Sequence, residues 1–150
     1  MKSLISILLT SILLAKFAEA AQKPIVIAVV DTGYSQASYA PSPRFCRFGH
    51  ADLSGSDLNL HKIPEDNNGH GTHIVHTIEK QLLNAPEGSY CIVVLKYFDT
   101  SAKSSEQQNI KNSIAAFNLA TKMRVDFVNY SSAGEKADPS EELAVKKCLI

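Results

Sequence analysis

Short segments made almost entirely of apolar residues alternate along the chain with longer segments of apolar and polar residues. The spacing of the apolar residues differs between the two kinds of segment. Residues 25–30 form an uninterrupted apolar run that is mostly β-branched, and residues 91–98 and 125–130 are mainly apolar and aromatic. Runs of this composition are typical of strands buried on both faces of a parallel sheet. Between and after them, apolar residues recur every three or four positions, as in amphipathic helices. The pattern predicts the order strand, helix, strand, helix, strand, helix, an α/β fold with a parallel β-sheet flanked by helices.

The first predicted helix begins near Thr72 and is ended by Pro86 and Gly88. Its apolar face consists of residues at helical spacing: Ile74, Val75, Ile78 and Leu82. The long segment 34–64 before it is rich in Pro, Gly, Ser and Asp. We expect that segment to be a loop with room for one short element.

The second and third predicted helices carry start signals. Ser105 and Gln108 have the spacing of a capping box, and the helix that follows presents one stripe: Ile110, Ile114, Phe117 and Thr121. Asp138 is a suitable N-cap residue, with Pro139 at the first helical position and Glu141 in the first turn. The third helix carries Leu143, Ala144 and Cys148.

The first twenty residues differ from the rest of the chain. Lys2 gives a short positive start, residues 4–14 are nearly all apolar, and 18–20 read Ala-Glu-Ala. This order of charge, apolar centre and small-residue site is the pattern of a secretory signal peptide. The alternative is an N-terminal membrane anchor, for which the apolar stretch is short.

We therefore expect residues 1–20 to be a signal peptide and 21–150 to be a secreted or periplasmic protein without membrane contact. The prediction is checked by mass spectrometry of exported protein, which should find Ala21 as the new N-terminus. Recovery of intact Met1 in a membrane fraction would instead favour the anchor.

Charge argues against one class of partner, and cysteine spacing argues against one class of metal site. The 15 Lys and Arg balance the 15 Asp and Glu, and no basic run occurs, so we expect no nucleic-acid partner. Cys46, Cys91 and Cys148 are too widely spaced for a known metal pattern. An exported chain can pair two of them and leave one free, and which two stays open. Cys91 opens an apolar strand, so we interpret it as a small buried hydrophobic residue.

The residues that carry chemistry gather in two short motifs. Asp31 directly follows the first apolar run, and Gly33 permits the sharp turn after it. His70 lies between two glycines, at or just before the start of a predicted helix. Because functional residues gather at the carboxyl ends of parallel strands, we expect Asp31 at that edge of the sheet. If Asp31 orients His70, the two side chains must meet there in a direct hydrogen bond, roughly 2.6–3.2 Å long. Such a pair provides the acid–base half of a nucleophilic site.

Other interpretations of these residues remain open. Asp31 can simply cap the turn after its strand. The single Asp-Thr-Gly triplet at 31–33 also fits an aspartic peptidase, which would need a homodimer to bring two such acids together. His70, His73 and His76 have a spacing that invites a metal site, although no acid follows them in the order of zinc motifs. We interpret His73 as a buried histidine beneath the site and predict no metal.

Five segments carry a family resemblance in their order along the chain. They are Asp-Thr-Gly at 31–33, His-Ala-Asp-Leu at 50–53, His-Gly-Thr-His-Ile at 70–74, the apolar run at 93–98, and Val-Asn-Tyr-Ser at 128–131. Together they resemble the subtilisin-like serine peptidases (subtilases), over nearly the whole chain after the expected signal peptide. The resemblance implies a subtilisin-like α/β fold, truncated to the N-terminal half of the catalytic domain.

The resemblance implies a serine endopeptidase that hydrolyses a peptide or protein substrate through an acyl-enzyme. Asp31 would orient and charge-stabilise His70, and His70 would take the proton from a serine hydroxyl. One segment would line the cleft and pair with an extended peptide as an added strand: Ser131, Ser132, Ala133 and Gly134. No cofactor is certain, and calcium is the option that the family suggests.

The nucleophile that this chemistry needs is missing from the sequence. The family's Gly-Thr-Ser motif does not occur, and Ser131 and Ser132 correspond to the substrate cleft rather than to the nucleophile. We therefore expect the chain to hold the base and its orienting acid, and to be inactive alone. An alternative is a non-catalytic, peptide-binding remnant, which is favoured by Val75 and His76 where the family usually has Ala-Gly.

Overall fold

The computed structural model describes residues 23–35, 43–55, 59–100, 104–132 and 137–149. Within these ranges the chain forms four strands and three helices: β1 (Ile25–Asp31), β2 (Ala51–Asp52), α2 (His70–Gln81), β3 (Tyr90–Lys96), α3 (Glu106–Met123), β4 (Phe127–Tyr130) and α4 (Pro139–Cys148). The predicted α/β order is confirmed, and β2 is the short element within the predicted loop. The expected signal peptide lies outside the described residues. No helix in these ranges is long and apolar enough to cross a membrane.

The four strands form one parallel sheet in the order β2-β3-β1-β4. Asp31 at the end of β1 is in register with Lys96 at the end of β3, and its neighbour Val30 is in register with Tyr130 at the end of β4. The carboxyl ends of three strands therefore meet at one edge, which is where functional residues of parallel sheets gather.

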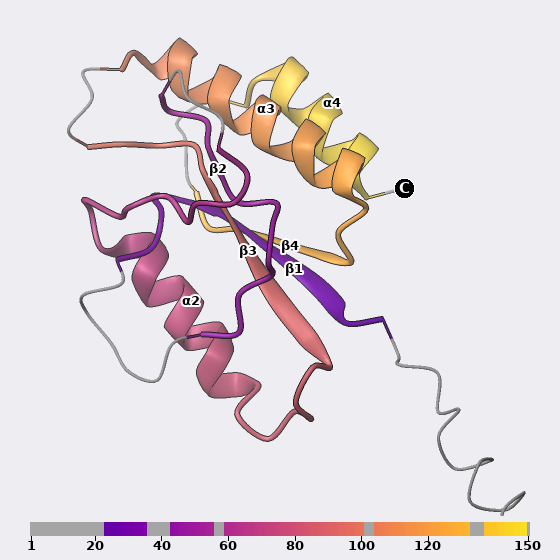
Figure 1. Ribbon diagram of the computed structural model, residues 1–150. Helices are drawn as coiled ribbons and strands as arrows, with labels where there is room; N and C mark the ends of the chain where they lie inside the picture. The colour runs from indigo at the N-terminus through magenta and orange to yellow at the C-terminus, as the bar shows by residue number, and fades with distance from the viewer. Residues whose placement is uncertain (1–22, 36–42, 56–58, 101–103, 133–136, 150) are drawn as a thin grey trace, which may run out of the picture.

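Helices cover the sheet on both faces (Figure 1). Helices α3 and α4 lie side by side over one face, and α2 lies over the other. Each face has its own core, because successive residues of β1 point to opposite sides. Ala28 and Val30 pack toward Ala116 and Ala120 of α3, whereas Val29 packs with Val75 of α2.

Helix α3 buries a different stripe from the predicted one. Its buried residues are Asn112, Ser113, Ala116, Phe117 and Ala120, whereas Thr121 is exposed and Ile110 and Ile114 are only half-buried. Small side chains at three of these positions allow the helix to lie close to the sheet and to α4. The packed face of α3 is thus selected by close approach rather than by the largest apolar side chains. Leu143 of α4 is also exposed, and Ala144 takes its place in the core.

A disulfide joins Cys46 to Cys91, and Cys148 is the free cysteine of the described residues. The interpretation of Cys91 as an unpaired buried residue is therefore wrong. The bond joins the segment before β2 to the start of strand β3. The buried ring of His50 strengthens this connection, because Nδ1 accepts the Val94 N–H at 3.1 Å and Nε2 donates to the Cys46 carbonyl at 2.9 Å. Burial lowers the pKa of His50, which keeps the ring neutral.

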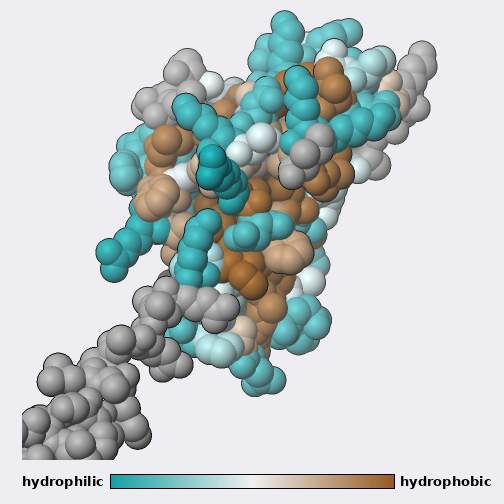
Figure 2. Space-filling view, turned by 90° about the vertical axis from the view of Figure 1, so that its right-hand side faces the viewer, coloured by the Kyte–Doolittle hydropathy of each residue, from teal (hydrophilic) through white to brown (hydrophobic). Residues whose placement is uncertain are grey.

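Several large apolar side chains remain exposed among the described residues: Ile25, Phe48, Leu60, Leu83, Phe127, Leu143 and Leu149. Figure 2 shows apolar surface gathered in a band on the side of the molecule that faces the viewer. Phe127 is 61% exposed on β4, which is an edge strand and is paired on one side only, with β1. Strand β4 therefore offers both an open hydrogen-bonding edge and apolar surface.

Candidate functional site

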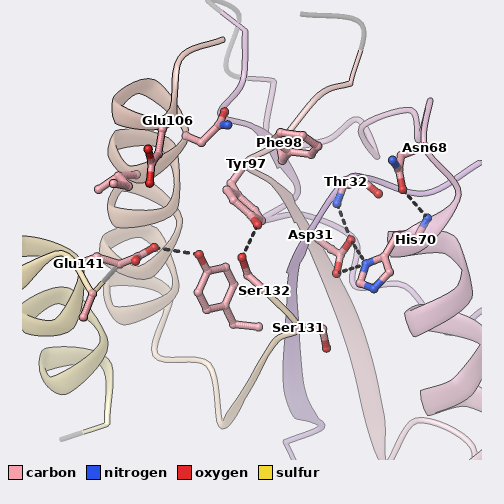
Figure 3. A pocket seen from close by; sticks show the side chains of 14 residues that line it. Asp31, Thr32, Asn68, His70, Tyr97, Phe98, Glu106, Ser131, Ser132 and Glu141 are labelled. Carbon is pink, nitrogen blue, oxygen red and sulfur yellow. Dashed lines mark hydrogen bonds and ion pairs between the residues drawn. The ribbon is translucent and has the colours of Figure 1, made fainter. Parts of the chain in front are cut away.

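Asp31 and His70 meet at the carboxyl edge of the sheet (Figure 3). Asp31 ends β1 and is 2% exposed, and His70 is the first residue of α2 with its side chain 46% exposed. The Nδ1 atom of His70 lies 2.8 Å from Oδ1 and 3.0 Å from Oδ2 of Asp31. The predicted contact is confirmed. Because a carboxylate accepts hydrogen bonds, this geometry places the ring proton on Nδ1 and leaves Nε2 as the free basic nitrogen.

Two glycines allow the start of α2 to pack against the turn after β1. Gly33 has a φ of +114°, and a Cβ there would lie 2.6 Å from the Glu65 carbonyl oxygen. A Cβ on Gly71 would lie 2.4 Å from the Gly33 carbonyl oxygen. Both clashes are with backbone atoms, which cannot rotate away. The absence of side chains at these two positions thus allows the start of α2 to lie close enough for His70 to contact Asp31.

Asp66 holds the strand end and the helix start together, and the sequence analysis missed it. Its Oδ1 accepts hydrogen bonds from the Thr32 hydroxyl and from the N–H groups of Asn68 and Gly69, at 2.8–2.9 Å. Its Oδ2 accepts from the N–H and the hydroxyl of Thr72, at 2.9 and 2.6 Å. The position of this acid just before a predicted helix, ahead of an Asn-Asn-Gly turn, was the available signal.

The charge of Asp66 is stabilised although the side chain is buried. Burial raises its pKa, but the hydrogen bonds from Thr72, Gly69 and Asn68 together outweigh that effect and lower the pKa to about 2. Thr32 extends the network, because its hydroxyl accepts the Gly71 N–H at 2.9 Å while its own N–H donates to Oδ1 of Asp31 at 2.8 Å. The network therefore connects both members of the Asp31–His70 pair.

A cleft of about 910 Å³ opens beside this pair, with Asp31, Thr32, Asn68 and His70 at one end. Ser131 and Ser132, which directly follow β4, are exposed and line the cleft as predicted. The Ser132 hydroxyl oxygen accepts a hydrogen bond from the Tyr97 hydroxyl at 2.9 Å. Ala133 and Gly134, the other two predicted substrate-binding residues, lie outside the described residues.

No described serine hydroxyl hydrogen-bonds to His70, whose side chain contacts Asp31. Ser131 instead donates to the Asn129 side chain at 3.0 Å, and Ser132 is bound by Tyr97. Among the described residues, the His70 ring is thus in contact with Asp31 and with no serine hydroxyl.

The three histidines of α2 do not converge. His70 is bound to Asp31, the Nε2 atom of His76 lies 3.3 Å from the Tyr34 hydroxyl, and His73 is exposed. The prediction of a buried His73 is wrong, because the packed side of α2 consists of Gly71, Thr72 and Val75. Among the described residues, no group of three His, Cys, Asp or Glu side chains is arranged to hold a metal ion.

The aspartic-peptidase interpretation requires Asp31 to face a second acid. In the structure the carboxylate of Asp31 is buried, and both of its oxygens face the His70 ring. The Thr32 N–H also donates to Oδ1. The arrangement favours a histidine-directed role for this acid over a shared proton between two acids.

Comparison with known proteins finds a distant similarity to a serine protease. No family model matches the chain. The chain is 29% identical over 133 residues to the major intracellular serine protease of Bacillus subtilis (strain 168), an alignment that covers 85% of this chain and 40% of that protein. The chain thus spans about two fifths of the length of this curated relative. These findings relate the chain, at a distance, to a serine protease.

Proposed function

We propose that the chain carries the acid–base half of a subtilisin-like serine endopeptidase site. The observation that carries the proposal is the 2.8 Å contact between Nδ1 of His70 and Oδ1 of Asp31 at the carboxyl edge of a parallel sheet. The distant similarity to a serine protease supports the same chemistry. The motifs at 31–33 and 70–74 resemble those of subtilases, and they are the reason for proposing a subtilisin-like site rather than another kind of serine protease.

Each residue of the pair has a separate role in this proposal. The carboxylate of Asp31 holds the ring proton on Nδ1, so that Nε2 of His70 is available as the base. Nε2 takes the proton from a serine hydroxyl while the serine oxygen forms its bond to the peptide carbonyl carbon. His70 then gives this proton to the leaving amine, and water removes the acyl group by the same route. Asp31 stabilises the imidazolium that forms in between.

The substrate in this proposal is a peptide in extended conformation. Among the described strands β4 is an edge strand paired with β1, and Ser131 and Ser132 continue it into the cleft. An extended peptide can add beside this segment as a further strand, with its backbone hydrogen bonds providing affinity. Ala133 and Gly134 belong to the same proposed segment. The scissile bond would then pass in front of the exposed His70 ring.

The nucleophilic serine is proposed to come from a further segment that completes the site. The sequence contains no Gly-Thr-Ser motif, and the matched relative is considerably longer than this chain. A second candidate function, peptide binding without hydrolysis, is favoured by that missing motif and by the lack of a described serine bound to His70. One set of assays distinguishes the hydrolytic function from the binding function.

The test compares the full chain with a chimera in which the C-terminal part of a related serine protease, including its nucleophile, is joined after α4. A fluorogenic peptide should be hydrolysed negligibly by the full chain and rapidly by the chimera. The change His70→Ala in the chimera should lower kcat by on the order of 10⁶-fold, because nucleophile and base act as a unit. His73→Ala is the matched control, since His73 is an exposed histidine of the same helix.

Two results would contradict the proposal. Rapid hydrolysis by the full chain that a serine-directed phosphonate abolishes would reveal a nucleophile within this sequence. An active chimera that tolerates His70→Ala would remove the proposed role of His70. A chimera that binds peptide but never hydrolyses it would support the binding function instead.

We also propose that the protein is exported after removal of residues 1–20. The Cys46–Cys91 disulfide supports this proposal, because disulfides persist mainly in oxidising compartments.

A further inference from the structure

The cleft has a second end, away from His70, where the first turns of α3 and α4 face the aromatic residues at the ends of β3 and β4. We call it the distal end, and its lining residues are Tyr97, Glu106, Asn109, Ile110, Tyr130 and Glu141. Figure 3 shows Glu106 and Glu141 on one side of the cleft, Asp31 and His70 on the other, and Tyr97 and Ser132 between them. A ligand that fills the whole cleft therefore contacts both His70 and the distal end.

The described lining of the cleft contains more acidic than basic side chains. Its described residues include three carboxylates, those of Asp31, Glu106 and Glu141, and neither lysine nor arginine. Asp31 is buried and already hydrogen-bonded to His70. Negative charge thus remains at the distal end, although the chain as a whole has no net charge.

Glu106 is the exposed carboxylate of the distal end. It forms no hydrogen bond or ion pair with another described residue. Glu142, an exposed acid in the first turn of α4, differs from Glu106 because its carboxylate forms an ion pair with Lys146 at 2.6 Å. An acid in the first turn of a helix also complements the helix dipole, but that role does not require it to face a cleft.

Glu141 and the aromatic residues form the rest of the distal end. One oxygen of Glu141 accepts hydrogen bonds from the hydroxyls of Tyr130, at 2.8 Å, and Ser113. The rings of Tyr97 and Tyr130 pack edge to face, with centroids 5.4 Å apart. Aromatic faces attract ammonium and guanidinium groups, and apolar walls accept the methylene stem of a long basic side chain.

We propose that Glu106 is a specificity-determining residue, which makes the cleft prefer extended peptides that carry a lysine or arginine side chain a few residues from the bond at His70. Glu141 provides the second carboxylate of this subsite. The inference rests on the proposed function, since it assumes that a peptide occupies the cleft.

The test measures equilibrium binding to the full chain by fluorescence anisotropy. The probes are fluorescein-labelled nine-residue peptides of alanine and glycine that differ at one scanned position, which holds lysine, arginine, norleucine or glutamate. At low salt, lysine and arginine at one position should tighten binding about three- to tenfold relative to norleucine. The advantage should shrink with added salt.

Three variants test whether the preference for lysine over norleucine depends on Glu106. Glu106→Gln should remove most of the advantage of lysine over norleucine while the norleucine peptide binds as before. Glu142→Gln changes the net charge equally at a site outside the cleft and should keep the preference. His70→Ala should also keep it, because recognition at the distal end does not need the base.

Failure of this inference is distinguishable from failure of the proposed function. Equal binding of lysine and norleucine peptides at every position, or a preference that survives Glu106→Gln, would overturn the inference alone. If none of the peptides binds, the peptide cleft itself is contradicted, and both proposals fall.

Discussion

Replacing Asp31 by Asn in the active chimera is expected to lower kcat by on the order of 10⁴-fold. Both oxygens of Asp31 face Nδ1 of His70, at 2.8 and 3.0 Å, and hold its proton there. An asparagine can turn its NH₂ group toward Nδ1, which then becomes an acceptor and moves the ring proton to Nε2. In that tautomer the nitrogen facing the substrate is no longer a base, so the chemical step slows while peptide binding persists.

The measurement is kcat and KM separately, with the ring tautomer of His70 followed by nitrogen NMR. We expect a large change in kcat, a small one in KM, and a shift of the ring proton from Nδ1 to Nε2. Asp52→Asn is the matched control, because Asp52 also ends a strand of the sheet but does not line the cleft. A loss below about tenfold, with the proton still on Nδ1, would show that Asp31 does not orient His70.

Replacing Asp66 by Ala is expected to lower the free energy of unfolding of the full chain by about 3–5 kcal/mol. The change leaves the two hydroxyls and three N–H groups that Asp66 binds without their acceptor, in a site where Asp66 is only 7% exposed. Glu65→Ala, at the exposed neighbouring acid, should change stability by less than about 0.5 kcal/mol. Urea unfolding measures both.

The pH dependence of stability distinguishes the charge of Asp66 from its shape. A carboxyl whose pKa is lowered by folding stabilises the protein above its unfolded pKa, and this stabilisation is lost as the pH falls through the folded pKa. For Asp66 that window runs from 3.8 down to about 2. The stability difference between wild type and Asp66→Asn should shrink by about 2 kcal/mol across it. A difference that does not change with pH would show that the charge contributes nothing.

The order of elements and the positions of Asp31 and His70 could be predicted from local signals in the sequence. Their contact spans 39 positions and was expected from the orienting role that the resemblance to subtilases implies. Residues 25–30 are apolar at every position, which marks a strand buried on both faces. In a parallel sheet the residue after such a strand lies at the carboxyl edge, so the place of Asp31 follows. The position of His70 at a glycine-flanked helix start follows in the same way.

The loop contacts and the buried faces of the helices could not be predicted from the sequence, because they depend on tertiary packing. Asp66 was one acid among several in a long loop, and its partner Thr32 is 34 positions away in the sequence. Cys46 and Cys91 are 45 positions apart, and neither has a local signal for pairing. Pairings of this kind arise only when the chain brings distant segments together.

The distal end of the cleft was decided by the same long-range packing. Glu106 and Glu141 each read as ordinary first-turn acids of separate helices. Side-by-side packing of α3 and α4, where the Ser113 hydroxyl donates to Glu141, brings both acids to one cleft. The sequence by itself determined the fold class and the positions of Asp31 and His70 at a strand end and a helix start, because those signals are periodic and local. The tertiary structure decided which side chains surround that pair, because close approach between elements depends on shapes that periodicity does not encode.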